Sequence, residues 1–225
     1  SNIMGFYRGP NIVTDGLIFA VDAGSTRSYP GTGTVATDLV GSKTGTLTNG
    51  VGFNSNNGGS WDFDGTDDYI NFGVTGFDFG TGNFNVSCWI KTTMTNASYT
   101  GVVSKYSTTG LWIQLTPTNK YVGFGWDGST FLLSTTTPVN NGAWRHISCQ
   151  RTGSTTAEIY VDGVLITSGV GSSASSDSTH QLDIGRIDVS GRYFDGDISN
   201  TMLYNKALTA AEISQNYNAQ KNRFI

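Results

Sequence analysis

Hydrophobic and polar residues alternate with a period of two along most of this chain. In EIYVDGVLI, residues 158–166, apolar side chains on both sides of an Asp-Gly pair would line one face of a two-stranded ribbon. Similar stretches recur at intervals of roughly 8 to 15 residues with turn residues between them, the spacing of a β-sandwich or jelly roll. The predicted strands are 16–23, 61–64, 68–72, 84–92, 101–105, 111–116, 121–126, 131–135, 144–151, 156–162, 164–168, 181–187 and 196–204.

Asp-Gly pairs separate several of these strands. Both residues tolerate the positive φ that two-residue hairpin turns require, so an Asp-Gly pair after an apolar strand predicts a hairpin. The acidic stretch FDGTDDYINF, 63–72, is on this basis first a turn leading into a strand. The pairs lie at 15–16, 64–65, 127–128, 162–163 and 195–196.

One helix is predicted, at the C-terminus, over about 209–220. Thr209 can cap its first free amides, and Glu212 three residues later can bond back to Thr209. Leu208 before the cap faces Ile213 as a hydrophobic staple. The helix is expected to dock on the sandwich.

The composition favours a single all-β domain. The 225 residues include 30 glycines, and only 13% of the residues are charged. We therefore predict one domain over 16–225 that includes the helix, preceded by an extended arm, 1–15. Phe6, Tyr7 and Arg8 in this arm are candidate contacts to a partner that would tether the domain.

The charge pattern excludes some partners. The net charge is −4 and no cluster of Lys and Arg is present, which argues against nucleic acid or an anionic membrane. No apolar run approaches the roughly 20 residues that span a bilayer. Cys88 and Cys149 lie in strand patterns, and two alternatives stay open for them, a disulfide or buried free thiols.

Six stretches of the chain follow one another in a characteristic order and spacing. They are FDGTDDYINF, NFNVSCWIKT, NGAWRHISCQR, EIYVDGVLI, LDIGR and YFDGDISNTMLYNKALTAAEI. Together they resemble the laminin-G-like, concanavalin A-like lectin/glucanase superfamily. This resemblance implies two curved antiparallel sheets packed face to face, with ligand or metal sites on the concave face or the loop rim. Relatives often have Ile-Asp-Glu-Val where this chain has Ile-Ser-Asn-Thr at 198–201, so no role of those carboxylates carries over.

The two ends carry a narrower resemblance. Residues 8–34 and 215–225 look like laminin-G-like structural proteins of tailed bacteriophages of marine bacteria. This resemblance implies a virion component.

Catalytic groups are not evident in the sequence. Glycoside hydrolysis needs two carboxyl groups about 5 to 10 Å apart, and glucanase relatives place them as Glu-x-Asp-x-x-Glu on one strand. The two glutamates, Glu158 and Glu212, cannot form this motif. His146 and His180 lie beside no nucleophile signature and are expected to be structural. We predict no catalytic residue.

Calcium is a candidate cofactor, because flexible Asp-rich and Gly-rich loops supply the oxygen ligands that it requires. The alternative is that these carboxylates only accept local backbone amides and the protein has no cofactor. The candidate ligands are Asp22, Asp64, Asp67 and Asp195.

A sugar site would use aromatic rings as stacking platforms with polar groups around them. The alternative is that these rings are buried, as a sandwich of this size must bury many, Trp89 and Trp144 among them. The candidates are Tyr106, Trp112, Tyr121 and Trp126.

These observations favour a non-enzymatic surface or adhesion protein of a phage particle, a capsid decoration or fibre-associated module. Its expected partners are other virion proteins and host-surface glycans, and a homo-oligomer is an open alternative. The second hypothesis is a soluble, extracellular carbohydrate-binding module of a bacterial protein. The third, a glycoside hydrolase, is the least favoured.

Overall fold

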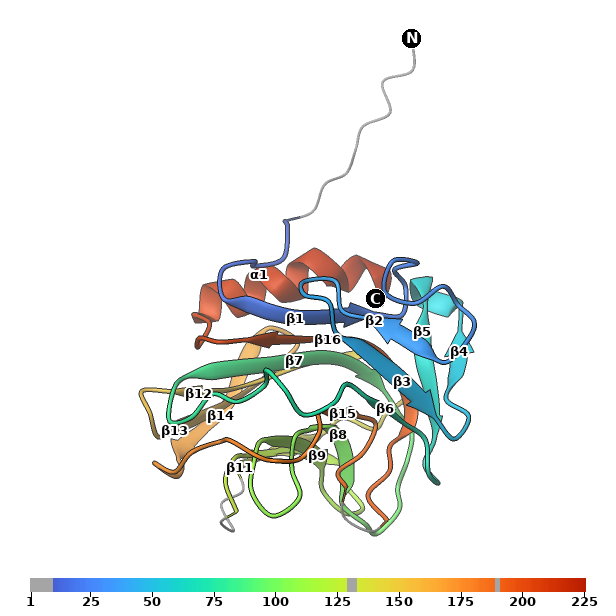
Figure 1. Cartoon of the computed structure of the whole chain (residues 1–225). Coiled ribbons are helices and arrows are strands. Elements are labelled where there is room, and N and C mark those ends of the chain that lie inside the picture. The colour runs from blue at the N-terminus through green and yellow to red at the C-terminus, as the bar shows by residue number, and fades with distance from the viewer. Residues whose placement is uncertain (1–9, 129–132, 189–190) are drawn as a thin grey trace.

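The computed structural model describes residues 10–128, 133–188 and 191–225. Its strands form two antiparallel sheets that pack face to face, as the sequence predicts (Figure 1). Sheet A has the order β14-β13-β12-β7-β16-β5-β4, and β1 also pairs with β16. Sheet B has the order β11-β10-β9-β8-β15-β6-β3-β2. The chain is therefore a jelly-roll sandwich of the concanavalin A type.

Sheet A contains the longest strands. Its strands are β1 (Leu17–Asp22), β4 (Gly52–Asn54), β5 (Ser60–Asp64), β7 (Phe84–Lys91), β12 (Arg145–Thr152), β13 (Thr156–Val161), β14 (Val164–Val170) and β16 (Asp195–Tyr204). The strands of sheet B are β2 (Val35–Thr37), β3 (Thr44–Thr48), β6 (Tyr69–Asn71), β8 (Thr100–Ser104), β9 (Trp112–Leu115), β10 (Tyr121–Gly125), β11 (Leu133–Pro138) and β15 (Asp183–Ile184). The helices are α1 (Ala210–Gln220) and the short 3-10 turns η1 (Asn56–Gly58) and η2 (Lys221–Arg223).

The sequence pattern missed three short strands, β2, β3 and β4. Their sequences, VAT, TGTLT and GFN, contain few large apolar residues, so they lack a clear alternation. Strand pairing orders them all the same, since backbone hydrogen bonds do not depend on side-chain type. Strand β3 pairs with β6, β4 pairs with β5, and β2 pairs with β3.

The core lies between the sheets. Inward side chains such as Trp61, Phe63, Ile70 and Ile113 are at most 1% exposed. Cys88 and Cys149 are free thiols in this core, and burial raises the pKa of Cys88 to about 12. Burial raises the pKa of Cys149 as well.

Helix α1 covers the outer face of sheet A (Figure 1). The predicted cap is confirmed, because the Thr209 hydroxyl accepts from the Glu212 amide while the Glu212 carboxylate accepts from the Thr209 amide. Trp89 and Trp144 are buried as predicted, but they pack against Phe224 under the C-terminal segment and not between the sheets. Within the described residues, no helix is long and apolar enough to cross a membrane.

The Asp-Gly pairs have three different roles. Asp162 and Gly163, with φ of 52° and 80°, form the predicted hairpin between β13 and β14. Asp64 and Gly65 do not form a hairpin, because β5 lies in sheet A and β6 in sheet B. Their turn carries the chain from one sheet to the other. Gly196 lies inside β16, where a Cβ would meet the Lys91 carbonyl oxygen at 2.3 Å.

Candidate functional site

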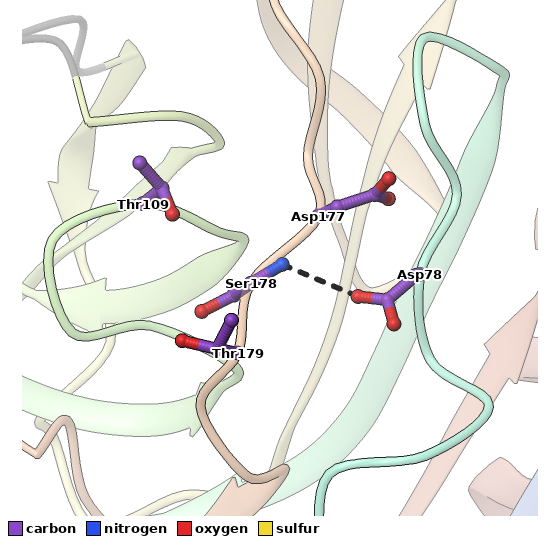
Figure 2. A pocket seen from close by; sticks show the side chains of 5 residues that line it. All are labelled: Asp78, Thr109, Asp177, Ser178 and Thr179. Atoms are coloured by element: carbon purple, nitrogen blue, oxygen red, sulfur yellow. Dashed lines mark hydrogen bonds between the residues drawn. The ribbon is translucent and has the colours of Figure 1, made fainter.

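A cavity lies at one end of the sandwich, where three loops meet. It has a volume of about 310 Å³ and is lined by Asp78, Thr109, Asp177, Ser178 and Thr179 (Figure 2). We call it the rim pocket. The loop from β6 to β7 contributes Asp78, the loop from β8 to β9 contributes Thr109, and the loop from β14 to β15 contributes the other three.

A buried ammonium group fixes two of these loops. The side chain of Lys105 is fully buried, and its Nζ donates to Oδ1 of Asp78 at 2.6 Å and to the Ser178 carbonyl. The Ser178 amide donates to the same Asp78 oxygen at 3.2 Å, as the dashed line in Figure 2 shows. A hydrogen-bonded buried charge of this kind sets the loop geometry, because losing one partner exposes the other to a large desolvation cost.

Arg151 joins the β6–β7 loop to the β14–β15 loop a second time. It is fully buried, and its guanidinium donates to the carbonyl groups of Gly80, Ala174 and Ser154. Burial lowers its pKa. Asp177 accepts from the Gly80 amide at 2.6 Å through Oδ1. The loops at both ends of the pocket are therefore tied to one another before any ligand binds.

Each acidic residue of the rim pocket keeps an oxygen for a ligand. The hydrogen bonds found in the described chain use Oδ1 of Asp78 and Oδ1 of Asp177 and leave both Oδ2 atoms without a protein donor. Asp177, Thr109 and Thr179 are exposed. The pocket thus offers carboxylate and hydroxyl oxygens on a rigid frame, a set of groups that suits a neutral polyhydroxylated ligand.

None of the predicted aromatic platforms is among the residues that line the rim pocket, and two of them are buried. Trp126 is 1% exposed and packs on Phe84 and Phe124 in the core, so neither face of its ring is open. Trp112 is not in the core between the sheets, but only 8% of it is exposed. Tyr121 and Tyr106 are half-buried, and Tyr106 shares the β8–β9 loop with Thr109.

The four predicted metal ligands do not form one cluster. Asp22 is bound by Arg223, whose NH1 lies 2.8 Å from both carboxylate oxygens, so this candidate already has a cation partner. Asp64 and Asp67 lie with Asp68 in one cluster, where one carboxylate oxygen of each is within 4.8 Å of the others. Asp195 is the β16 partner of Asp64 across the sheet. Phe6, Tyr7 and Arg8 lie outside the described residues.

The histidines have the structural settings that the sequence predicts. His146 is 1% exposed between Trp89 and Tyr217, and burial lowers its pKa to about 3. His180 lies 3.0 Å from Asp188, and burial lowers its pKa too.

Sequence reasoning missed the rim pocket, because its residues lie in stretches without a motif. Asp78 lies in GFDFGTGNF and Asp177 in SSASSDSTH, which resemble ordinary loops. The one available signal was Lys105 directly after an apolar strand, since a lysine at that place in a strand pattern needs a buried partner.

Solved structures share this fold. The binding domain of Paraclostridial Mosquitocidal Protein 1 superposes with a TM-score of 0.76 at 15% identity, covering 91% of this chain and 52% of that chain. Domain 4 of AbnA, a GH43 extracellular arabinanase from Geobacillus stearothermophilus, in complex with arabinotriose, superposes with a TM-score of 0.68 at 17% identity. The match covers 89% of this chain and 98% of that domain. Trypanosoma rangeli sialidase in complex with sialic acid superposes with a TM-score of 0.71 at 16% identity. The match covers 96% of this chain and 35% of the sialidase chain.

These similarities differ in extent. The chain spans about half the length of the mosquitocidal binding domain and about a third of the sialidase, but it corresponds to nearly the whole arabinanase domain. No curated protein matches the sequence. A family model, Laminin_G_3, matches residues 64–214, from the acidic turn to the middle of α1. The chain therefore belongs to the concanavalin A-like lectin/glucanases superfamily.

Proposed function

We propose that this protein is a non-enzymatic, lectin-like domain that binds glycans through the rim pocket. The observation that carries the proposal is the set of free oxygens from Asp78, Asp177 and Thr109 on loops that Lys105 and Arg151 hold rigid. A preformed site of this kind binds without the cost of ordering its loops. Its walls are polar and shallow, which suits a weak sugar site used in many copies.

The fold neighbours support the same ligand class. Domain 4 of the arabinanase was solved with arabinotriose, and the binding domain of Botulinum Neurotoxin DC was solved in complex with SialylT. The two glutamates support a role without catalysis. Glu158 accepts from Gln150 and from the Tyr160 hydroxyl, and Glu212 caps α1 and pairs with Lys206. Both are therefore engaged in structural contacts.

Binding by the wild-type chain to an array of neutral and acidic oligosaccharides tests the proposal. The best ligand is then titrated by calorimetry against Asp177→Asn and Thr109→Val, which retain most of the pocket shape. We expect each variant to weaken binding about tenfold, the value of one to two hydrogen bonds. Asp188→Asn, a matched acid-to-amide change at an exposed carboxylate outside the pocket, should bind as wild type. Equal affinity of all four proteins would overturn the assignment of the pocket.

Release of reducing sugar tests the absence of catalysis. We expect none from a broad polysaccharide panel, and release that disappears in Asp177→Asn would make the protein a glycosidase.

We further propose that the domain is displayed on a phage particle. The basis is the resemblance of residues 8–34 and 215–225 to virion proteins. Residues 11 and 13 dock on the domain, because the Asn11 carbonyl accepts from Gln215 and the Val13 amide donates to Asn216. The part of the arm left to hold a neighbouring subunit is therefore 1–9, with Phe6, Tyr7 and Arg8.

A variant lacking residues 1–9 tests this tether. It should fold with an unchanged melting temperature but fail to join particles. Incorporation at the wild-type level would exclude the tether. Recovery of the wild-type chain only in free form, away from purified particles, would favour the second hypothesis, an extracellular carbohydrate-binding module.

A further inference from the structure

Strand β14 forms one edge of sheet A and exposes a group of large apolar side chains. The exposed fractions of Val164, Leu165, Ile166 and Val170 are 62%, 46%, 40% and 78%. These are four of the nine large hydrophobic side chains that are exposed in the described residues, although β14 has only seven residues. Single exposed apolar residues are ordinary, but a contiguous group of them marks a contact surface.

The backbone of β14 is open on the side away from β13. Sheet A ends at this strand, and within the described ranges no hydrogen bond joins its outer side to another segment. Edge strands of natural proteins are commonly protected by charged residues or proline. The sequence of β14, VLITSGV, has neither, whereas β11, at the edge of sheet B, ends at Pro138. This edge is therefore available for strand pairing.

A β-bulge explains why three successive side chains of β14 are exposed. The pairing with β13 skips from Leu165 to Thr167, so Ile166 is an extra residue in the strand. The bulge interrupts the alternation of faces and divides the strand into two parts. Residues 167–170 have a regular backbone that can pair with a further strand, and residues 164–166 supply apolar side-chain contacts.

A small cavity lies beside Ile166, between the edges of the two sheets. Its volume is about 70 Å³, and strands β11, β12, β13 and β14 contribute to its walls. Small-molecule pockets commonly have volumes of about 300 to 1,000 Å³, so this cavity suits one apolar side chain better than a free ligand. The lining residues are Thr137, Pro138, Val139, Arg145, Val161 and Ile166.

Residues 1–9, which lie outside the described residues, have the composition of a strand that would cover β14. Their sequence, SNIMGFYRG, contains an isoleucine, a methionine and two aromatic residues. At about 3.3 Å per residue, nine extended residues span about 30 Å and the seven of β14 about 23 Å. Arg8 carries the one side-chain charge of this segment, so the net charge of −4 divides into +1 for residues 1–9 and −5 for residues 10–225. Length, apolar character and charge thus match the edge.

The geometry of sheet A favours β14 of a neighbouring copy over β14 of the same molecule. Val13 packs in one buried cluster with Ala20 of β1 and Met202 of β16, so the arm joins the domain there. Strand β14 is the fourth strand from β16, about 19 Å away at about 4.8 Å per strand. Crossing that distance would use about six of residues 1–9 and leave about three to pair. A neighbouring copy can receive the whole segment.

We propose that residues 1–9 of one copy add as a strand to β14 of a second copy and place one apolar side chain in the cavity beside Ile166. Backbone hydrogen bonds to residues 167–170 supply affinity, and the cavity fixes the register. Mutual exchange gives a closed dimer, and one-way exchange gives an open chain of copies. The inference extends the tether proposed above by naming its receiving surface, and it requires no particle.

The molar mass in solution tests this proposal, measured by light scattering after size-exclusion chromatography over a range of concentrations. We expect oligomers of the wild-type chain and a monomer of the variant lacking residues 1–9. Val170→Lys places a charge on the pairing edge and should also give a monomer. Val74→Lys, a matched change at an exposed valine in the β6–β7 loop, should keep the wild-type mass. Circular dichroism and a cooperative thermal transition check that each variant is folded.

A fluorescent peptide of residues 1–9 separates the donor segment from the receiving edge. It should bind the variant lacking residues 1–9, with a rise in anisotropy. Val170→Lys in that variant should weaken binding at least about tenfold, because an unpaired ammonium group is costly to bury.

Two results would overturn the proposal. One is a wild-type chain that stays monomeric at every concentration. The other is an oligomer that persists without residues 1–9 and is lost in Val170→Lys, because β14 would then pair with β14 of a second copy. Incorporation into particles is measured separately, so oligomers in solution without incorporation would contradict the display on a phage particle alone.

Discussion

Two buried aspartates near strand β6 differ in their partners: Asp68 directly precedes the strand, and Asp183 lies in β15, which pairs with it. Asp183 is fully buried and accepts from Asn71 at 3.1 Å and from Nε of Arg186 at 2.8 Å. Asp68 is 3% exposed, accepts one backbone amide and otherwise faces other carboxylates. Asp183 thus lies in a closed network, in which each carboxylate oxygen has a donor, whereas Asp68 lies in an open cluster of carboxylates, in which one of its oxygens has none among the described residues.

The difference shows how a buried carboxylate indicates structure or binding. Asp183 has a donor for each oxygen, and Arg186 in turn stacks over Tyr69 with 3.5 Å between its guanidinium carbon and the ring centre. No further group is needed there. Asp68 has, within the described residues, one oxygen without a hydrogen-bond donor, and the carboxylates of Asp64 and Asp67 lie beside it. Both aspartates are buried, and they differ in whether each carboxylate oxygen has a hydrogen-bond donor.

The largest expected effect comes from removing the Arg186 partner of Asp183. Arg186→Met removes the cation and leaves Asp183 buried without a counter-charge. We expect a loss of about 3 to 5 kcal/mol in the free energy of unfolding at pH 7.5, the usual cost of breaking a buried ion pair. Urea denaturation measures it. Asp188→Asn, which removes only the half-exposed partner of Arg186, should cost about 0 to 1 kcal/mol. Equal losses would contradict the comparison.

The pH dependence of stability gives a second test of the environment of Asp183. Burial raises the pKa of Asp183 to about 6 in spite of the hydrogen bonds from Arg186. A carboxyl group with a raised folded-state pKa contributes stability that is present below its unfolded pKa and is lost as pH rises through about 6. Wild-type stability should therefore decrease by roughly 1 to 2 kcal/mol relative to Asp183→Asn between pH 4.5 and 7.5.

This difference isolates Asp183 from its titrating neighbours. Burial lowers the pKa of His180, so His180 acts in the opposite direction and loses stability as pH falls. His180, Asp188 and Arg186 are present in both proteins, so their contributions largely cancel. A difference curve without slope would show that Arg186 compensates the charge of Asp183 completely.

The smallest expected effect concerns the open cluster. In calcium-free buffer, Asp68→Asn should change the free energy of unfolding by less than about 0.5 kcal/mol or stabilise the protein slightly. The amide keeps an oxygen for the Asp64 amide and directs a donor where an unpartnered acceptor lay. Urea midpoints measured in EDTA test this. A loss above about 2 kcal/mol would mean that the Asp68 carboxylate has a structural partner of its own.

Local chemistry made the helix and one hairpin predictable. Thr209 and Glu212 form a capping box that depends only on residues three apart, and the turn at Asp162 depends only on the φ preferences of two residues. Gly196 carries the same Asp-Gly signal but lies inside β16. There the long pairings with β5 and β7 outweigh the turn preference.

The candidate sites were less predictable for the same reason. Asp64 and Asp67 were predicted together because they are neighbours in sequence, whereas Asp22 was assigned to them without any means of seeing Arg223, 201 residues away. Alternation cannot tell the core face of a strand from its open face, so the sequence does not show that Trp126 is buried.

The class of fold, the position of the helix and the concentration of acidic groups in the 64–68 turn are all predictable from the sequence, because they follow from period, capping and local composition. Only the folded chain shows that Lys105 anchors Asp78, that three distant loops form one pocket, and that Oδ1 of Asp68 has no donor among the described residues. Those facts depend on which strands become neighbours and on what each side chain meets when water is removed. Neither is encoded within a short stretch of chain.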